Sequence, residues 1–125
     1  MSNAVDSRLE LAKALRELAD GSTEASLRGA LSRSYYSIFH AANVLLGKVS
    51  HGDIAKKLGI IDPELEDRVN KLQQLRSQAD YDPRLVEREF KGNVEQFRLD
   101  VRRQVDEGLS VFNRILREIE RKAKG

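Results

Sequence analysis

Apolar residues recur at steps of three and four along almost the whole chain, and this spacing restricts the fold to helices. The longest run begins at Phe90 and ends at Ile119. Residues three and four positions apart lie on one face of an α-helix, so each run predicts a helix with one apolar stripe. No segment alternates apolar and polar residues as a half-buried strand does. The sequence therefore predicts an all-α protein.

Glycines and the two prolines mark where these helices begin and end. Pro63 and Pro83 each follow an aspartate. Asp-Pro is typical of a helix start, because the aspartate caps free N–H groups and proline suits the first helical position. Long helices are expected over 6–19, 23–46, 63–79 and 93–121. Breaks or turns are expected at 47–53, 59–61 and 81–83, with fraying from 122 onward and a short helix ending at 58.

The length of the chain fits one domain that covers residues 1–125. Short connections between long helices make sequential neighbours antiparallel, which predicts an up-and-down bundle. The helix over 23–46 is nearly apolar on all sides from Tyr35 to Leu46. It is therefore expected at the centre of the bundle.

The composition excludes several classes of protein. The chain has no cysteine, so it offers neither disulfides nor thiolate metal ligands. No apolar run approaches the roughly 20 residues of a membrane span, and the N-terminus lacks the apolar core of a signal peptide. A cytoplasmic protein without membrane contact is expected. The net charge of +2 does not by itself supply the concentrated basic surface of a duplex-binding protein.

The common catalytic motifs are missing. There is no glycine-rich phosphate loop, no His-Glu-x-x-His and no Gly-x-Ser-x-Gly, and His40 and His51 are the two histidines. No cofactor and no metal are expected. In the last third, arginines and lysines alternate with acidic residues. That pattern indicates a solvated helix face with pairs such as Glu118–Lys122, or a face that binds RNA.

Two polar segments are candidates for chemistry. Arg33, Tyr36 or Ser37, and His40 share one face of the expected central helix, and Arg76 lies one turn before Asp80. Antiparallel packing would set the second segment against the first. The cluster then either forms a satisfied network that fixes helix register, or leaves groups open for a phosphate or a base. Arginine donates two parallel hydrogen bonds to phosphate, and tyrosine stacks on bases.

The same segments resemble a known family. The matching residues are Arg33-x-Tyr35-Tyr36-x-x-Phe39-His40-Ala41-Ala42, the loop His51-Gly52, and Leu75-Arg76-x-x-Ala79-Asp80-Tyr81-Asp82. They resemble HEPN-domain proteins, in particular the small stand-alone HEPN proteins of prokaryotes, over roughly residues 9–121. The resemblance implies a four- to five-helix bundle that commonly forms a homodimer. It also implies a link to nucleotides or RNA, and a nucleotidyltransferase partner, often within a toxin–antitoxin pair.

The resemblance also points to a departure from the catalytic members. HEPN ribonucleases carry Arg-x4–6-His near the start of a late helix and cleave RNA without a metal, through a site shared across the dimer. Arg76 occupies the position of that arginine, but Tyr81 and Asp82 stand where the histidine belongs. Arg33-x6-His40 has the spacing on a different helix. The candidate site residues are Arg33, Tyr36, His40, His51, Arg76, Asp80 and Tyr81.

Three functions follow as hypotheses. The first is a HEPN-type module that binds a nucleotide, RNA or a nucleotidyltransferase, without catalysis of its own. The second is a metal-independent ribonuclease toxin that uses His40 or His51 as general base. The third is a structural dimerisation domain, whose last helix keeps apolar positions such as Val111, Phe112 and Ile119 for a second copy.

Overall fold

The computed structural model describes residues 23–124. The described chain is helical and contains no strand, which confirms the predicted all-α class. Its helices are α2 (Glu24–Leu46), α3 (Ile54–Ile61), α4 (Pro63–Tyr81), α5 (Leu85–Phe90) and α6 (Val94–Lys124). The helix predicted over 6–19 lies outside the described residues.

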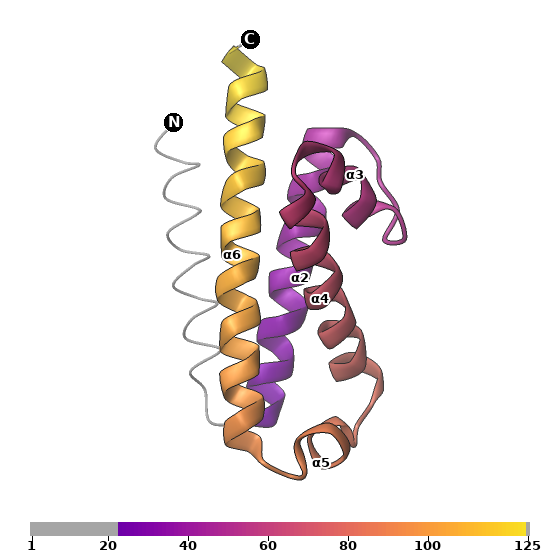
Figure 1. Cartoon of the computed structure of the whole chain (residues 1–125), viewed down its shortest axis with the longest axis vertical. Coiled ribbons are helices and arrows are strands. Elements are labelled where there is room, and N and C mark those ends of the chain that lie inside the picture. Colours follow the sequence, from indigo (N-terminus) through magenta and orange to yellow (C-terminus); the bar gives the residue numbers. More distant parts are fainter. Residues whose placement is uncertain (1–22, 125) are drawn as a thin grey trace.

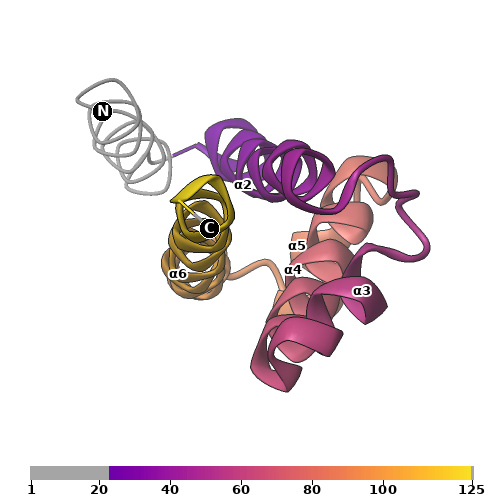
Figure 2. The ribbon, with the colours of Figure 1, turned by 90° about the horizontal axis from the view of Figure 1, so that it is seen from above.

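Three long helices carry the fold of residues 23–124 (Figure 1). Helix α2 rises, α4 returns beside it and α6 rises again, and Figure 2 shows the three arranged as a triangle with α3 beside α4. An ion pair of 3.2 Å joins Arg114 of α6 to Asp62 at the start of α4. Lys122, near the end of α6, donates to the carbonyl of Leu45, near the end of α2, at 3.5 Å. The antiparallel arrangement therefore holds for α2–α4 and for α4–α6, while α2 and α6 run parallel.

The core lies where the three long helices meet. Leu31 and Ile38 from α2, Leu72 from α4 and Val105 from α6 are almost completely buried. Gly108 of α6 lies so close to α2 that a Cβ atom there would overlap the Ser34 hydroxyl, and it would lie 3.2 Å from Leu72 Cδ2. The missing side chain lets the helices approach at this point.

Two expectations about exposed and buried faces were wrong. Helix α2 is not covered on all sides, because Tyr36, His40 and Val44 lie four residues apart on one face that is exposed. Val111 is 1% exposed, and Phe112 and Ile119 pack against the same core. The apolar stripe of α6 therefore packs within the chain. These residues no longer support a dimer formed through that helix.

Capping side chains explain several helix starts. Asp62 accepts a hydrogen bond from the Glu64 amide at 3.0 Å with Pro63 in the first turn, as the Asp-Pro pattern predicted. Asn93 accepts from the Gln96 amide at 3.1 Å at the start of α6. Asp82 accepts from an amide in the same way, yet α5 begins only at Leu85, two residues after Pro83.

The structure corrects three predicted helix ends. Helix α3 continues through Gly59 to Ile61, where a break was predicted. A Cβ atom on Gly59 would overlap the Glu66 side chain, so this glycine allows α3 to approach α4 and does not end the helix. Helix α4 includes Tyr81, which was placed in a turn. Helix α6 reaches Lys124 and does not fray from residue 122. Its basic last turn suits the negative end of the helix dipole.

Candidate functional site

Rings from α2 and the loop after it gather around one arginine of α4. The ring cluster consists of Tyr35, Tyr36, Phe39, His51 and Arg76. The guanidinium carbon of Arg76 lies 4.6 Å from the centroid of the Tyr35 ring and 5.5 Å from that of Tyr36. Both distances are within the range of a cation–π contact. The arginine thus crosses from α4 onto the aromatic face of α2.

Arg76 is a buried cation with few hydrogen bonds. Its residue is 7% exposed. Nη1 donates to Asp80 Oδ2 at 3.1 Å, which confirms the predicted pair one turn apart. The buried Nε has no hydrogen-bond partner among the described residues. A buried donor without a partner costs about 1–3 kcal/mol, so this arginine is held mainly by the two rings and one carboxylate.

His51 is exposed, but its ring is fixed from two directions. Its Nδ1 lies 2.7 Å from the Tyr35 hydroxyl. Its face stacks on Phe39 with centroids 4.0 Å apart and planes 10° apart. The backbone carbonyl of His51 accepts a hydrogen bond from Gln73 of α4 at 3.3 Å. The loop is therefore tied to both α2 and α4, and the imidazole has a defined orientation.

The Tyr35 hydroxyl determines what His51 can offer. Burial raises the pKa of Tyr35; the nearby Arg76 charge opposes this shift, and Tyr36 adds to it. The phenol is therefore protonated at neutral pH. When the imidazole carries its hydrogen on Nε2, Tyr35 donates to Nδ1 and Nε2 is a donor. When the hydrogen is on Nδ1, that group donates to the phenol oxygen and Nε2 is free to accept a proton.

The structure brings together some predicted site residues and separates others. Tyr36, His51, Arg76 and Asp80 lie in or beside the ring cluster. His40 lies at its edge, with its ring 6.4 Å from that of Tyr36. Arg33 and His40 are exposed, and Tyr81 is 79% exposed at the end of α4.

The predicted contact between the two polar segments is therefore correct for Tyr36 but not for Arg33 and His40. Helix α2 presents Arg33 and His40 to solvent, because they lie on its exposed face. Sequence reasoning also missed two residues of the cluster. Tyr35 and Phe39 were not among the candidate site residues, although they belong to or pack against the core and also contact the ring of His51.

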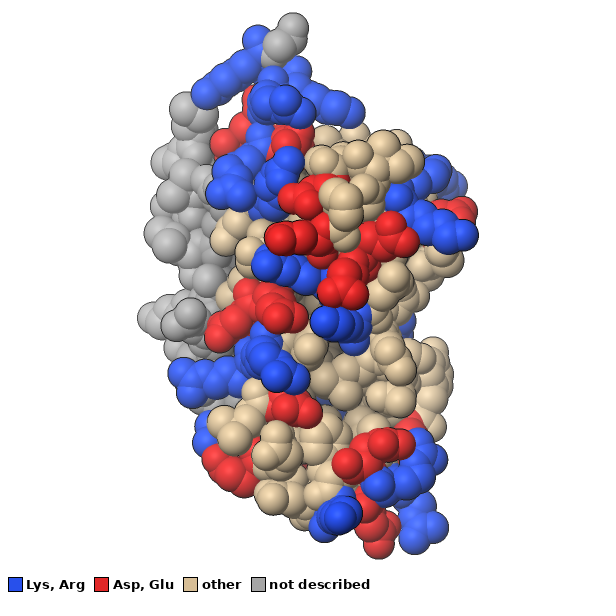
Figure 3. Space-filling view, viewed as in Figure 1, with Lys and Arg blue, Asp and Glu red and all other residues tan. Residues whose placement is uncertain are grey.

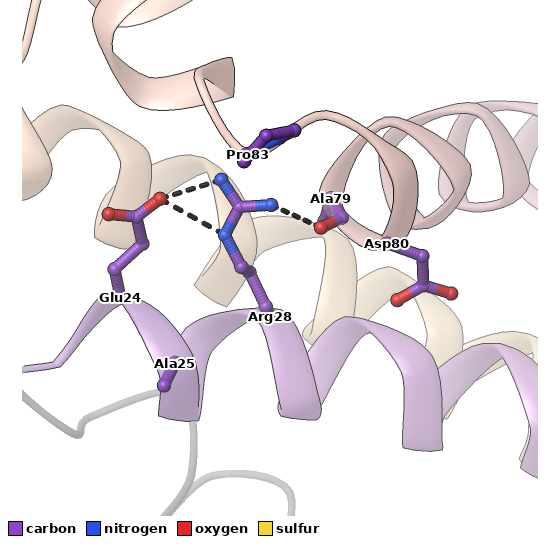
Figure 4. A pocket seen from close by; sticks show the side chains of 6 residues that line it. All are labelled: Glu24, Ala25, Arg28, Ala79, Asp80 and Pro83. Atoms are coloured by element: carbon purple, nitrogen blue, oxygen red, sulfur yellow. Dashed lines mark hydrogen bonds and ion pairs between the residues drawn. The ribbon is translucent and has the colours of Figure 1, made fainter.

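A hollow of about 640 Å³ opens at the C-terminal end of α4, where Asp80 is among the residues that line it (Figure 4). Arg28 projects into it from α2. Its Nε and Nη2 both donate to Glu24 Oε1, at 3.0 and 2.6 Å. Its Nη1 donates to the carbonyls of Ala79 and Asp82, the latter at 3.0 Å. Arg28 thus caps the C-terminus of α4 and has little capacity left for an anionic ligand.

Charges on the remaining surface are mixed. Figure 3 shows Lys and Arg interspersed with Asp and Glu over the face it displays. Glu118 pairs with Arg114 at 3.1 Å and with Arg121 at 2.5 Å. The hydrogen bond from Arg121, and to a smaller degree the one from Arg114, lowers the pKa of Glu118. The predicted intrahelical pairing of α6 is confirmed. The specific pair Glu118–Lys122 is wrong, because Lys122 donates to the Leu45 carbonyl instead.

Comparisons with known proteins give no family. No protein-family model matches the chain, and neither a curated protein nor a solved structure matches it. Within residues 23–124, no helix is long and apolar enough to cross a membrane. Over the same range, no group of three or more His, Cys, Asp or Glu side chains is arranged to hold a metal ion.

Proposed function

We propose that this chain is a HEPN-like module that binds single-stranded RNA or a nucleotide through the ring cluster, without catalysis of its own. One observation carries the proposal: a buried cation, Arg76, lies against the buried ring of Tyr35 and the partly exposed ring of Tyr36 at the contact of α2 and α4. Aromatic rings and an arginine together are the groups with which proteins hold unpaired bases and phosphates.

The chemistry of the cluster suits such a ligand. Tyr36 is 38% exposed and His51 is exposed, so both rings are within reach of a base. Arg76 places its charge against the Tyr36 ring, 5.5 Å from its centroid, where low solvent access strengthens its attraction for a phosphate. Asp80 is the carboxylate that pairs with Arg76 within the described chain. A ligand phosphate therefore competes with Asp80 for the guanidinium.

Features of the fold support the HEPN-like part of the proposal. Three long helices run up, down and up, and Arg76 lies in the last two turns of α4, on the side that packs against α2. At the positions where catalytic relatives carry histidine, Tyr81 is largely exposed and Asp82 is paired with Arg88. This departure favours a binding role over cleavage.

The resemblance also supplies the proposed setting. It is a cytoplasmic homodimer that works beside a nucleotidyltransferase, in a toxin–antitoxin pair or a related system. The exposed Tyr36 and Val44 on one face of α2 favour self-association. Light scattering on the purified protein at high concentration tests this: a dimer supports the setting, and a strict monomer argues against it.

Titration with AMP and with short single-stranded oligoribonucleotides, at about 0.1 M salt, tests the binding function. We expect saturable binding that Arg76→Gln weakens by about tenfold or more, since the variant removes the charge against the Tyr36 ring. Arg33→Gln is the matched control, because Arg33 is exposed and its side chain is not part of the cluster. Thermal unfolding verifies that each variant is folded. Absence of binding by the unaltered protein rejects the proposal.

A second function, metal-independent RNA cleavage, is favoured by one specific observation. His51 is linked through Tyr35 to Arg76, so a histidine and the motif arginine belong to one cluster despite the missing Arg-x4–6-His spacing. In this reading His51 Nε2 removes the proton of a ribose 2′-hydroxyl. Incubation of the protein with RNA in the presence of EDTA tests for metal-independent cleavage. Cleavage that is lost in both His51→Ala and Arg76→Gln supports it, and intact RNA rejects it.

A further inference from the structure

The three rings of Tyr35, Phe39 and His51 are nearly parallel. The planes of Tyr35 and Phe39 differ by 23°, those of Tyr35 and His51 by 25°, and those of Phe39 and His51 by 10°. Tyr36 is close to perpendicular to all three, at 77°, 83° and 87°. Phe39 and His51 form the stacked pair, with centroids 4.0 Å apart, while Tyr35 lies beside this pair, 6.3 Å from Phe39 and 5.6 Å from His51, and Tyr36 stands across the rings.

His51 is the exposed member of the stacked pair. Tyr35 is fully buried and Phe39 is partly buried, whereas His51 is exposed. Phe39 covers one face of the imidazole and the Tyr35 hydroxyl holds one edge. These contacts leave the face of the imidazole opposite Phe39, while Tyr36 stands across the rings with its centroid 5.8 Å from that of His51. A planar group that enters from solvent onto that face therefore extends the stacking of Phe39 on His51.

We propose that an unpaired nucleobase stacks on the face of His51 that Phe39 does not cover, and that Tyr35 is the positioning residue that holds this ring in place. The proposal rests on the nucleotide-binding function above and names the part of the ligand that the site recognises. Arg76 then serves the phosphate or ribose side of the same nucleotide.

Physical reasons favour a base over other planar groups. Stacking of a base on a protein ring is tolerant of sequence, because every base has a π-face. A base within a duplex is already stacked and paired, so only single strands and free nucleotides can use such a platform. Fixing the imidazole in advance lowers the ordering cost that binding otherwise incurs. That is the role assigned to the Tyr35 hydroxyl and to Phe39.

The first experiment separates base recognition from phosphate recognition. AMP, ribose 5-phosphate and inorganic phosphate are titrated into the full chain by calorimetry. Stacking predicts that AMP binds at least about tenfold more tightly than ribose 5-phosphate, which has the same sugar and phosphate without the base. Equal affinity for the two overturns the stacking proposal and leaves the nucleotide-binding function standing through the phosphate. No binding of any probe removes both.

The second experiment tests the histidine directly. His51→Ala is expected to weaken AMP binding by about tenfold and to reduce the quenching of 2-aminopurine in a bound single-stranded oligoribonucleotide. His51→Phe keeps a planar ring and should retain most of both signals. His40→Ala is the matched control, since His40 is also exposed but lies at the edge of the cluster. Unchanged AMP affinity in His51→Ala, with loss in Arg76→Gln, overturns the proposal.

The third experiment isolates the positioning role of Tyr35. Tyr35→Phe keeps the buried ring and removes only the hydroxyl that contacts His51. We expect it to weaken AMP binding several-fold in the unaltered background and to have no effect in the His51→Phe background, where no imidazole remains to be held. An equal loss in both backgrounds would show that the hydroxyl acts only on general packing, and the positioning role would be wrong.

Discussion

Two arginines lie at the contact between α2 and α4, and they are satisfied very differently. Arg28 donates to Glu24 and to two carbonyls at the end of α4. Arg76, farther along the same contact, has one carboxylate, two aromatic faces and an Nε without a partner in the described chain. At the last turns of α4, the same residue type thus serves as a saturated structural cap, Arg28, and as an under-satisfied cation, Arg76.

This difference indicates where outside chemistry can act. A cation whose hydrogen bonds are complete gains little from a ligand, because each new bond must replace an existing one. A cation held mainly by rings keeps capacity for an acceptor. Stability should therefore depend most on Arg28, and ligand affinity most on Arg76.

The largest expected effect is a loss of stability when Arg28 is replaced. Arg28→Ala removes the donors for the Ala79 and Asp82 carbonyls and leaves Glu24 without its partner. We expect a loss of about 2–3 kcal/mol in the free energy of unfolding, since hydrogen bonds of charged groups are each worth roughly 1.5–3 kcal/mol. Urea denaturation measures it. If AMP affinity of the folded variant also falls by tenfold, the proposed separation of the two arginines' roles is wrong.

The second effect is a loss of ligand affinity when Arg76 is replaced. Arg76→Met keeps much of the buried volume and removes the charge. We expect the free energy of unfolding to change by less than about 1 kcal/mol, because replacing a buried ion by an apolar side chain of similar size is often neutral. AMP affinity should fall by about tenfold. A stability loss as large as that of Arg28→Ala would make Arg76 a second structural cap.

A third, smaller effect distinguishes Asp80 as a competitor from Asp80 as a support. Asp80→Asn removes the negative charge that pairs with Arg76. If a ligand phosphate displaces this carboxylate, AMP affinity should rise several-fold, while stability falls by less than about 1 kcal/mol for so exposed a partner. Calorimetry measures the affinity. A several-fold decrease would mean that Asp80 orients the guanidinium for the ligand.

The smallest effect is a control for stability itself. Gly29 follows Arg28 in α2, and a Cβ atom there would meet open space. Gly29→Ala should raise the free energy of unfolding by about 0.5–1 kcal/mol through helix propensity. AMP affinity should stay the same. A change in affinity would show that binding follows the overall stability of α2, in which case the comparison of the two arginines would need another explanation.

Much of the fold follows from local patterns, and most of the site does not. Asp62 and Pro63 predict the start of α4, and the pair of Arg76 and Asp80 can be predicted from their spacing alone. Gly59 was misread because only the position of Glu66 in the next helix shows why a side chain is absent there. A glycine that permits close packing and a glycine that ends a helix look the same in sequence.

The contact between Tyr35 and His51 shows the limit for the site. It joins a buried helix residue to a loop whose path no spacing rule provides. The contacts of Arg28 with the Ala79 and Asp82 carbonyls are equally out of reach, since backbone acceptors carry no signature in the sequence. Local rules therefore identified Arg76, but not its contact with the ring of Tyr35.

The parallel pairing of α2 and α6 has a consequence for how the chain acquires its shape. This is the most extensive helix contact in the described chain, and it joins segments separated by all of α3, α4 and α5. Contacts between distant segments form late and slow the search for the native state. On the ribosome, the apolar face of α2 that packs against α6, where Ile38 lies 3.7 Å from the Cβ position of Gly108, is therefore covered only after the final segment has been made. A chain that terminates early within α5 leaves that surface open to chaperones and proteases.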